Sequence, residues 1–540
     1  MKNKNIKHLL IILLSLVSLT ASAYDLEVDG IYYNVTSLSD LTCSVTYGDK
    51  KYEGTVVIPP TIVYNGRTLT VTGIEKDAFN LYRYYGNAIR SLTIPNTISS
   101  IPDDALYYCT SLDSLIIQDG DTEIDLGRPS NYSQGPLYNT PTSYVYVGRN
   151  LKKRRYSTSY DDYYDQFYST NIKVAEIGDK VTSMPFFYNS KQLKKVIFSK
   201  ESNIEIGDSI FMGCSKLSDI PENNNVSKIG KKSFYECSNL ASVSFPNAQT
   251  IEDYAFYKCS SLASVSIPNA QTIGYNAFYG CKSLASVSIP NAQTIESSAF
   301  NNCSNLASVS FPNAQTIGQY AFYNCSNLAS VSFPNAQTIG YGAFQYCSNL
   351  ESISIPNAQT IENNAFWNTA ITDIVIPKVK VLNDIFPNCI QSITLGDSIK
   401  SIASGAFAKS GLKTINIYTA TPPTLSESAC GNVQYMNVNV NVPVGAKEAY
   451  MNADVWKNFW SINEVLSTGI ESIVDTSADL AFSSTSDGII LSGADGQNVK
   501  VYGIGGEEVL SISNYHGQNL SLPKGIYIVK AGKKALKVRL

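Results

Sequence analysis

Cysteine is the residue type in this sequence whose spacing most invites a chemical interpretation. A thiol can form a disulfide, bind a metal ion or act as a nucleophile. The sequence holds 11 cysteines, and six of them recur at intervals of 22 residues: Cys237, Cys259, Cys281, Cys303, Cys325 and Cys347. These intervals lack the closely spaced pairs of a metal site. We therefore predict that the thiols bind no metal and no cofactor.

Histidine, the usual partner of a catalytic thiol or hydroxyl, is almost absent. Of the two histidines, His8 lies in a segment that we expect to be removed, which leaves His516. His516 lies in the polar sequence Asn514–Gly517, where an exposed turn residue is the simpler interpretation. The sequence therefore disfavours a Ser-His or Cys-His catalytic site.

Carboxylates could act as a paired acid and base, but none form a recurring pair in the repeats. They are scattered singly, as Glu252, Asp253, Glu296 and Glu362 illustrate. The sequence indicates no catalytic residue, and we predict that the protein is not an enzyme.

The interval of 22 residues predicts a solenoid, in which each repeat forms one coil and adds one strand to a stacked sheet. In one copy, Val265 and Ile267 are two residues apart and share one face of a short strand. Further along the coil, Ile273, Ala277 and Phe278 are expected to point inward again. One coil buries little alone, so neighbouring coils must stack to form a continuous core.

Stacking also predicts the state of the cysteines. Equivalent residues of neighbouring coils lie about 4.8 Å apart with parallel side chains, whereas the Cβ atoms of a disulfide are about 3.8 Å apart. Thr369 and Ser410 hold the cysteine position in later coils, which suits a small core residue. We therefore predict buried free thiols that pack as small hydrophobic side chains.

The first 420 residues divide into a leader, a cap and the repeat array. Residues 1–23 combine a basic start, a short apolar run and an Ala-Ser-Ala end, which is typical of a secretory signal peptide. Residues 24–54 are predicted to cap the array, which extends over residues 55–420 with about a dozen coils. A tyrosine-rich break interrupts the pattern at residues 120–170.

Two further segments follow the array. Residues 421–466 are predicted to form a terminal cap, with an amphipathic helix over Ala446–Trp460. Residues 467–540 alternate short strands with glycine-rich turns and are predicted to form a small β-sandwich. The expected fold class is thus a β-rich solenoid of parallel stacked strands and short helical turns, followed by this sandwich.

Composition narrows the class of partner. Charged residues make up 16% of the chain and the formal net charge is −4, which disfavours nucleic acid and anionic membranes as partners. The basic run Lys152–Arg155 lies among tyrosines, a combination that can bind single-stranded nucleic acid. Asp161, Asp162 and Asp165 follow and offset its charge, so an edge loop with aromatic contacts is favoured. No stretch after residue 23 is long and apolar enough to span a membrane.

The repeat pattern itself resembles a known family. Leu-x-x-Val-x-Ile-Pro, followed by Ile-Gly and by Ala-Phe-x-x-Cys, is similar to the BspA-like (Treponema-type) leucine-rich repeats of bacterial surface proteins. The C-terminal segment resembles the sorting domain of type IX secretion substrates in Thr468–Ile473, Val501, Tyr502, Leu522–Lys530 and the basic residues Lys533, Lys534 and Lys537. These resemblances imply export to the outer cell surface or the extracellular space. They also imply an adhesin that recognises a host matrix or cell-surface protein, or another bacterial surface.

Two kinds of surface are expected on the regular coils. The outward strand positions form a small, neutral strip that should supply little binding energy, made of Ser242, Ser244, Ser264, Ser266, Ser286, Ser288, Ser308, Ser310, Ser330, Ser332, Ser352 and Ser354. Positions that vary between copies hold aromatic residues, which dominate protein interfaces. The candidate binding residues are Tyr254, Tyr275, Tyr279, Tyr320, Tyr323, Tyr341, Tyr346 and Trp367.

These patterns support two hypotheses about function. The main one is a non-catalytic binding protein that recognises a protein or a cell through the solenoid face. The alternative is a structural spacer or coat component without a specific ligand, which near-identical copies would also suit. For the aromatic residues themselves, packing over neighbouring coils remains an equal alternative to binding.

Overall fold

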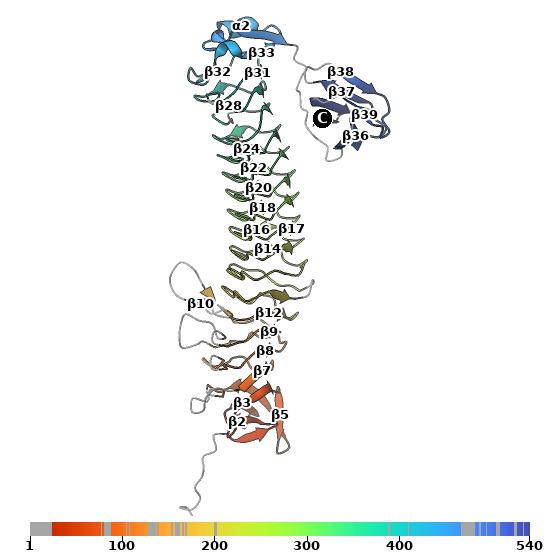
Figure 1. The fold of residues 1–540 in the computed structure, drawn as a ribbon. Helices are drawn as coiled ribbons and strands as arrows, with labels where there is room; N and C mark the ends of the chain where they lie inside the picture. The colour runs from red at the N-terminus through yellow and green to blue at the C-terminus, as the bar shows by residue number, and fades with distance from the viewer. Residues whose placement is uncertain are drawn as a thin grey trace, which may run out of the picture. The chain divides into compact units, whose positions relative to one another are not determined.

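The structure is a computed structural model of the chain (Figure 1). It describes residues 24–540 except 77, 80–87, 104, 107–108, 128–136, 138–139, 153–154, 157–162, 165–166, 168–169, 199–201, 387–388, 409, 432, 466–480, 485–487, 493, 504–507, 523–525, 533 and 540. The predicted signal peptide at 1–23 lies outside these residues. Internal contacts divide the chain into a first unit, Met1–Ala248 with Ala255–Leu262, and a second unit, Gln249–Tyr254 with Ala263–Leu540.

The first unit begins with a five-stranded sheet in the order β1-β2-β3-β6-β5. Its strands are β1 (Leu26–Val28), β2 (Ile31–Ser37), β3 (Thr42–Thr46), β5 (Thr61–Tyr64) and β6 (Arg67–Ile74). Pairing is antiparallel except between β3 and β6. Tyr33, Cys43, Val45 and Val71 are fully buried between these strands, so this sheet has a core of its own.

The coils of the first unit stack through a six-stranded sheet in the order β13-β12-β9-β8-β7-β4, and its strands pair in parallel. Its members are β4 (Glu53–Val57), β7 (Ala88–Ile94), β8 (Ser114–Ile117), β9 (Tyr144–Val147), β12 (Val174–Ile177) and β13 (Lys195–Ile197). The second and fourth residues of β8, β9 and β12 are buried, as period-2 geometry requires. Shorter strands also occur: β10 (Arg155–Tyr156), β11 (Tyr163–Tyr164), β14 (Lys228–Ile229) and β15 (Ser242–Ser244).

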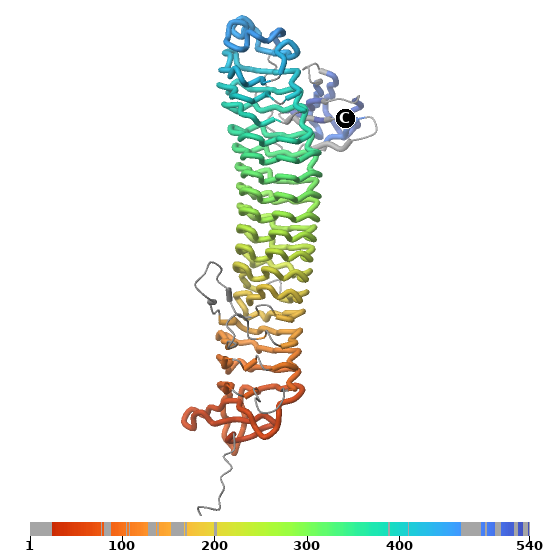
Figure 2. The backbone as a smooth tube through the Cα atoms, turned by 60° about the vertical axis from the view of Figure 1, so that its left-hand side comes forward, coloured from red at the N-terminus to blue at the C-terminus, as the bar shows by residue number. Residues whose placement is uncertain are grey.

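In the second unit each regular coil has a short strand on either side. On one side, two-residue strands pair in parallel at intervals of one coil: β16 (Thr250–Ile251), β18 (Thr272–Ile273), β20 (Thr294–Ile295), β22 (Thr316–Ile317), β24 (Thr338–Ile339) and β26 (Thr360–Ile361). On the other are three-residue strands: β17 (Ser264–Ser266), β19 (Ser286–Ser288), β21 (Ser308–Ser310), β23 (Ser330–Ser332) and β25 (Ser352–Ser354). Figure 1 shows the two strand series on opposite sides of the coils, and Figure 2 shows the coils as repeated flattened turns.

The core between the two strand series is a column of identical side chains. The rings of Phe278, Phe300, Phe322 and Phe344 are stacked, with centroids 5.1, 5.3 and 5.3 Å apart and planes within 6° of parallel. These phenylalanines are fully buried, and so are the neighbouring alanines and cysteines of the same coils. The repeated phenylalanine, alanine and cysteine of each coil are therefore core positions, as predicted.

All 11 cysteines are free, and all but one are buried, as predicted. The structure adds a hydrogen bond that the sequence did not indicate. Several of the repeat thiols donate to the carbonyl of the core phenylalanine in the preceding coil, as in Cys303 Sγ to Phe278 O at 3.1 Å and Cys325 Sγ to Phe300 O at 3.2 Å. Burial raises the pKa of the Cys303 thiol to about 12. Such a thiol stays protonated and is a poor nucleophile.

Beyond the regular coils, the second unit continues in a five-stranded parallel sheet and a three-stranded parallel sheet. The larger contains β27 (Asp373–Ile376), β29 (Ser392–Leu395), β31 (Thr414–Ile417), β33 (Asn439–Pro443) and β34 (Ser461–Val465). The smaller contains β28 (Val381–Leu382), β30 (Ser401–Ile402) and β32 (Thr424–Leu425).

The predicted helix over Ala446–Trp460 is wrong in length. The 3-10 helix η1 (Tyr435–Asn437) precedes it, α2 covers only Lys447–Asn452, and Trp456–Asn458 forms a separate 3-10 helix, η2. Between them Val455 has a φ of 66°, which no α-helix permits. The break lets Tyr450 OH donate to Thr419 O at 2.9 Å while Trp456 Nε1 donates to Pro423 O at 2.8 Å.

The C-terminal segment forms two sheets around one core, as the predicted sandwich requires. One sheet contains β35 (Ala481–Ser484), β36 (Gly488–Ser492) and β39 (Leu520–Ser521), and the other β37 (Val499–Gly503), β38 (Glu508–Ile512), β40 (Ile526–Ala531) and β41 (Lys534–Arg539). Ile489, Val501, Tyr515 and Val529 are fully buried in this core. Thr468–Ile473, part of the predicted sorting motif, lies outside the described residues.

Candidate binding surface

Two residues with left-handed backbone conformation follow the inner isoleucine of each regular coil. In the second unit the first position has φ of 53–58° and holds Tyr254, Asn276, Ser298, Tyr320, Gly342 and Asn364. The second has φ of 57–71° and holds Gly280, Asn302, Asn324, Tyr346 and Asn368. Glycine and asparagine adopt this conformation readily, but bulky residues seldom do. The three tyrosines at these positions are therefore sterically disfavoured.

Five of the eight predicted binding residues form one continuous cluster, which we call the aromatic ladder: Tyr320, Tyr323, Tyr341, Tyr346 and Trp367. The ring centroid of Tyr320 is 5.3 Å from that of Tyr341 and 5.6 Å from that of Tyr323. Tyr346 lies 5.2 Å from Tyr323 and 5.0 Å from Trp367. Interplanar angles of 74–86° make every contact edge-to-face, a favourable geometry for aromatic pairs. All five side chains are half-buried, so each keeps part of its ring accessible.

The other three predicted residues do not belong to the ladder as the ring contacts define it. Tyr254 and Tyr275 form a separate edge-to-face pair at 5.2 Å, and Tyr275 is 42% exposed. The hydroxyl of Tyr279 accepts a hydrogen bond from Asn302 Nδ2 at 3.1 Å. In the coil between the two groups, the equivalent positions hold Ser297, Ser298, Asn301 and Asn302. The structure thus divides one predicted set into a ladder, a pair and a single ring.

Hydrogen bonds hold one ring of the ladder, Tyr341, in place. Asn364 Nδ2 donates to Tyr341 OH at 2.9 Å, and the backbone N–H of Tyr341 donates to Glu362 Oε2 at 2.8 Å. Burial, followed by the neighbouring hydroxyl of Tyr341, raises the pKa of Tyr320. The Tyr320 hydroxyl is therefore protonated at neutral pH and can donate or accept hydrogen bonds.

The coils that carry the ladder have no cationic side chain. Residues 283–377 contain no lysine and no arginine, and their acidic residues are Glu296, Glu351, Glu362 and Asp373. The ladder therefore combines aromatic rings, amides and a weak negative charge. Lys258 shows the contrast in the first unit, where its Nζ lies 5.2 Å from the ring centroid of Tyr257 and 3.5 Å from Glu236 Oε1.

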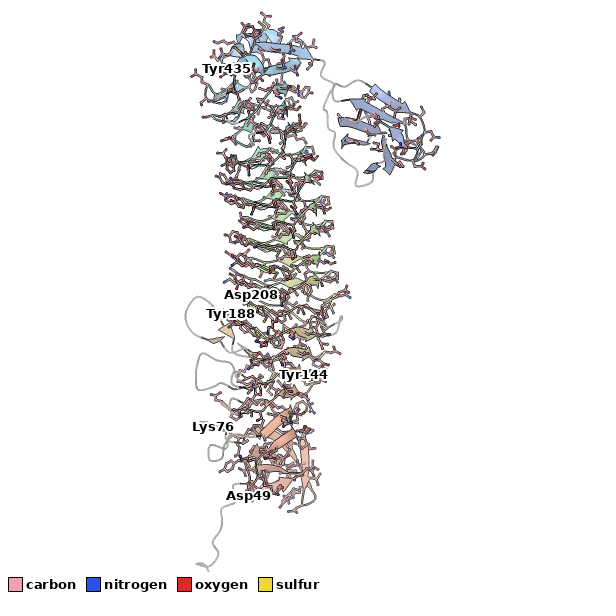
Figure 3. All side chains as sticks on the ribbon, viewed as in Figure 1. Asp49, Lys76, Tyr144, Tyr188, Asp208 and Tyr435 are labelled. Atoms are coloured by element: carbon pink, nitrogen blue, oxygen red, sulfur yellow. The ribbon has the colours of Figure 1, made fainter. Side chains whose placement is uncertain are left out.

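The row of outward serines on the strands, which we call the serine strip, lies on the side of the coil opposite the turns that hold the ladder. Figure 3 shows the two sides in the first unit, where Tyr144 of β9 lies opposite Tyr188 and Asp208, which occupy the turn positions of their coils. Both serines of each strand β17, β19, β21, β23 and β25 are exposed, while the residue between them is at least partly buried. The strip is thus an exposed row of small hydroxyls, as predicted.

The sequence reasoning missed a second aromatic surface, on the strand side of the first unit. Tyr144 OH donates to Glu176 Oε2 and Tyr146 OH donates to Asp119 Oδ1, both at 2.8 Å. Burial is the main cause that raises the pKa of both hydroxyls to about 12. The alternation Tyr144-Val-Tyr-Val147 within the tyrosine-rich segment was the available signal, since it is a strand pattern. Tyr132, Tyr138, Tyr160 and Tyr168 of that segment lie outside the described residues.

The described residues offer little support for a metal site or for histidine-based catalysis. In the part of the chain that the structure describes, histidine, cysteine and acidic side chains nowhere form a group of three that could hold a metal ion. His516 is exposed, and its Nδ1 lies 3.0 Å from Asp495 Oδ1. Among the described residues, no helix has the length and apolar character needed to cross a membrane.

Parallel strands at a fixed interval, a column of core phenylalanines and variable turns define a leucine-rich repeat solenoid. Residues 69–132, 163–285, 271–390 and 359–483 match the family of the BspA type leucine rich repeat region, with six copies of its model. The matched ranges cover well over half of the chain, and the chain belongs to this family. No curated protein matches it significantly.

Solved structures of leucine-rich repeat proteins are also similar to this chain. One from Bacteroides ovatus is 18% identical, with a TM-score of 0.39, over 82% of this chain and 100% of the other. A leucine rich cell surface protein from Faecalibacterium prausnitzii is 21% identical, with a TM-score of 0.29, over 81% and 97%. The pneumococcal vaccine antigen PcpA is 15% identical, with a TM-score of 0.26, over 83% and 100%.

Proposed function

We propose that the protein is a non-catalytic binding protein, displayed on the cell surface or secreted, that recognises another protein through the aromatic ladder. The observation that carries this proposal is the ladder itself. Five rings on consecutive coils contact one another, and each keeps part of its surface exposed. Leucine-rich repeat proteins of this type typically mediate protein–protein interaction.

The composition of this surface supports the proposal. Tyrosine and tryptophan supply large contact areas at little entropic cost, while serine, glycine and asparagine supply adaptable hydrogen bonds; antibody paratopes use the same residue types. The turns around the ladder hold Gln319, Asn324, Gly342, Asn363 and Asn364. These turns therefore resemble a paratope in residue types, presented on a rigid scaffold.

Export is part of the proposal. The signal-peptide pattern at 1–23 and the C-terminal sandwich with its basic last strand support secretion and display. An adhesin-like role toward a host matrix protein, a host cell or another bacterial surface follows from that location. The scattered carboxylates and the single histidine of the mature chain favour binding over catalysis.

Binding of the mature chain to immobilised matrix extract and to cultured cells tests this proposal. The variant Tyr323→Asn/Tyr346→Asn/Trp367→Asn replaces each ring with the residue that the same coil position holds elsewhere, at Asn301 and Asn302. We expect at least a tenfold loss of affinity with an unchanged circular dichroism spectrum. The matched control is Ser308→Ala/Ser330→Ala on the serine strip, which should bind as the wild type does. Equal binding by the ladder variant would remove the ladder as the recognition site.

A structural spacer is the second candidate, because the regular coils repeat with almost no variation outside the turns. A spacer needs no ligand, so binding to matrix or cells would be absent in the wild type as well as in the ladder variant. The same experiment therefore separates the two functions.

A further inference from the structure

One coil of this protein already shows how its ring positions hold a cation. In the first unit Tyr257 directly follows the core phenylalanine of its coil, and Lys258 Nζ lies 5.2 Å from its ring centroid. This distance is within the range of a cation–π interaction. Tyr323 and Trp367 directly follow the core phenylalanines of their own coils, so they occupy the same coil position as Tyr257.

The ladder has rings at the coil position of Tyr257, but its coils supply no cation to match Lys258. The positions equivalent to Lys258 are Asn324, Tyr346 and Asn368, and residues 283–377 contain neither lysine nor arginine. The charges in these coils are carboxylates, and Glu362 Oε2 bonds the backbone of Tyr341 within the ladder. A positively charged side chain over these rings must therefore come from outside these coils.

Backbone conformation is a second, independent observation at the same place. Tyr320 and Tyr346 have φ of 53° and 62°, where equivalent coils hold Asn276, Asn364 and Asn302. Asparagine would relieve the steric conflict. Unfavourable backbone conformations cost free energy and cluster at functional sites. Both disfavoured rings are needed for a continuous ladder, because Tyr320 joins Tyr323 to Tyr341 and Tyr346 joins Tyr323 to Trp367.

We propose that the aromatic ladder binds a lysine- or arginine-bearing segment of its partner protein, with the cationic groups over the faces of Tyr323 and Trp367. This inference rests on the proposed binding function and adds the chemistry of the partner. Tyr323 and Trp367 are two coils apart, which is about 10 Å at the spacing of stacked strands. A polyproline II segment advances about 9 Å in three residues, which make one full turn, so cations at every third residue share one side and match the two rings.

A pair of synthetic peptides tests the proposal on the mature chain. The first is a fluorescein-labelled peptide of about 13 residues, about 40 Å long in the polyproline II conformation, with arginine at every third position and glycine and serine between. The second replaces each arginine with citrulline, which keeps the shape and removes the charge. Fluorescence anisotropy at low salt should show at least tenfold tighter binding of the arginine peptide.

Ladder variants distinguish the rings from general electrostatic attraction. Tyr323→Asn/Trp367→Asn changes no formal charge, so it should leave non-specific attraction intact and yet lower the affinity for the arginine peptide at least fivefold. The control Tyr279→Asn removes a ring at the same coil position outside the ladder and should bind the peptide as the wild type does.

Four outcomes would overturn the proposal: equal affinity for the arginine and citrulline peptides, no binding of either, a ladder variant that binds like the wild type, or ladder-dependent binding of maltohexaose in place of the arginine peptide. The last would assign the rings to a neutral glycan. If matrix or cell binding still depends on the ladder in any of these cases, the proposed function stands and only the cationic partner is refuted.

Discussion

The two sides of the regular coils in the second unit share one backbone and one interval, yet they carry opposite kinds of surface. The strand side presents the same pair of exposed serines in β17, β19, β21, β23 and β25. The turn side changes from coil to coil, and its changes gather five aromatic rings into one cluster. The core fixes the coil, so variation is concentrated where it does not disturb the core. Specific recognition is therefore expected on the turn side.

The largest expected effect lies in the core that both sides share. Phe322 stacks between Phe300 and Phe344, with both centroids 5.3 Å away. Phe322→Ala should destabilise the second unit by about 3–5 kcal/mol, because it removes a buried ring and leaves a cavity. The urea midpoint measured by circular dichroism checks this. If the urea midpoint changed as little as it does for a surface substitution, the stacked phenylalanines would not be what stabilises the coils.

A moderate effect is expected from pH through the buried thiols. Burial raises the pKa of Cys303 from 9.0 to about 12. The folded chain therefore has its full stability below pH 9, where the thiol is protonated in both the folded and the unfolded chain. As pH rises from about 9 toward 12 the folded chain loses stability, because the unfolded chain releases a proton that the folded chain keeps. One thiol contributes at most about 1.4 kcal/mol per pH unit.

The variant Cys303→Thr isolates the thiol, since Thr369 holds the same coil position and donates to Phe366 O at 2.9 Å. Thermal midpoints between pH 8 and 11 should fall less steeply for the variant than for the wild type. Equal slopes would mean that the Cys303 thiol does not differ between folded and unfolded chains.

A smaller effect on stability is expected on the turn side. Tyr320→Asn removes two edge-to-face contacts, each contributing about 0.5–1.5 kcal/mol, but relieves a left-handed tyrosine that costs about 1–2 kcal/mol. The change in the free energy of unfolding should therefore lie between a gain of about 1 kcal/mol and a loss of about 2 kcal/mol. A loss above about 2 kcal/mol would favour rings that only cover neighbouring coils. Tyr254→Asn, which removes one such contact, is the control.

The smallest effect is expected on the strand side. Ser330→Ala removes an exposed hydroxyl and should change the free energy of unfolding by less than about 0.5 kcal/mol. It should also leave matrix binding and arginine-peptide binding unchanged. Weaker binding by this variant would place part of the recognition surface on the serine strip and end the contrast between the two sides.

The parts of this fold that depend on repeated residues could be predicted from the sequence. Leu262, Ile267, Ile273 and Phe278 are all fully buried, because each recurs at one interval and can only face its own copies. The strands of the C-terminal sandwich were predictable for a similar reason, since short alternating runs lie between glycine-rich turns.

Contacts between non-equivalent residues could not be predicted. Tyr320 contacts Tyr323 in its own coil and Tyr341 in the next, and neither pair is separated by one full repeat. The hydrogen bond from the Cys303 thiol to the backbone carbonyl of Phe278 also joins non-equivalent residues of two coils. The break between α2 and η2 depends on the distant carbonyls of Thr419 and Pro423. Such contacts depend on the stacked coordinates, which the interval alone does not supply.

The hydrogen bond from each of these thiols to the preceding coil affects how the number of repeats can change. Within the regular block the coils of Cys303, Cys325 and Cys347 each donate one hydrogen bond, through the thiol, to the phenylalanine carbonyl of the coil before. A duplicated or deleted 22-residue unit would therefore leave no donor or acceptor unmatched. Unequal recombination between near-identical copies can thus lengthen or shorten the block without a second, compensating mutation. New turn residues can then diversify on each added coil.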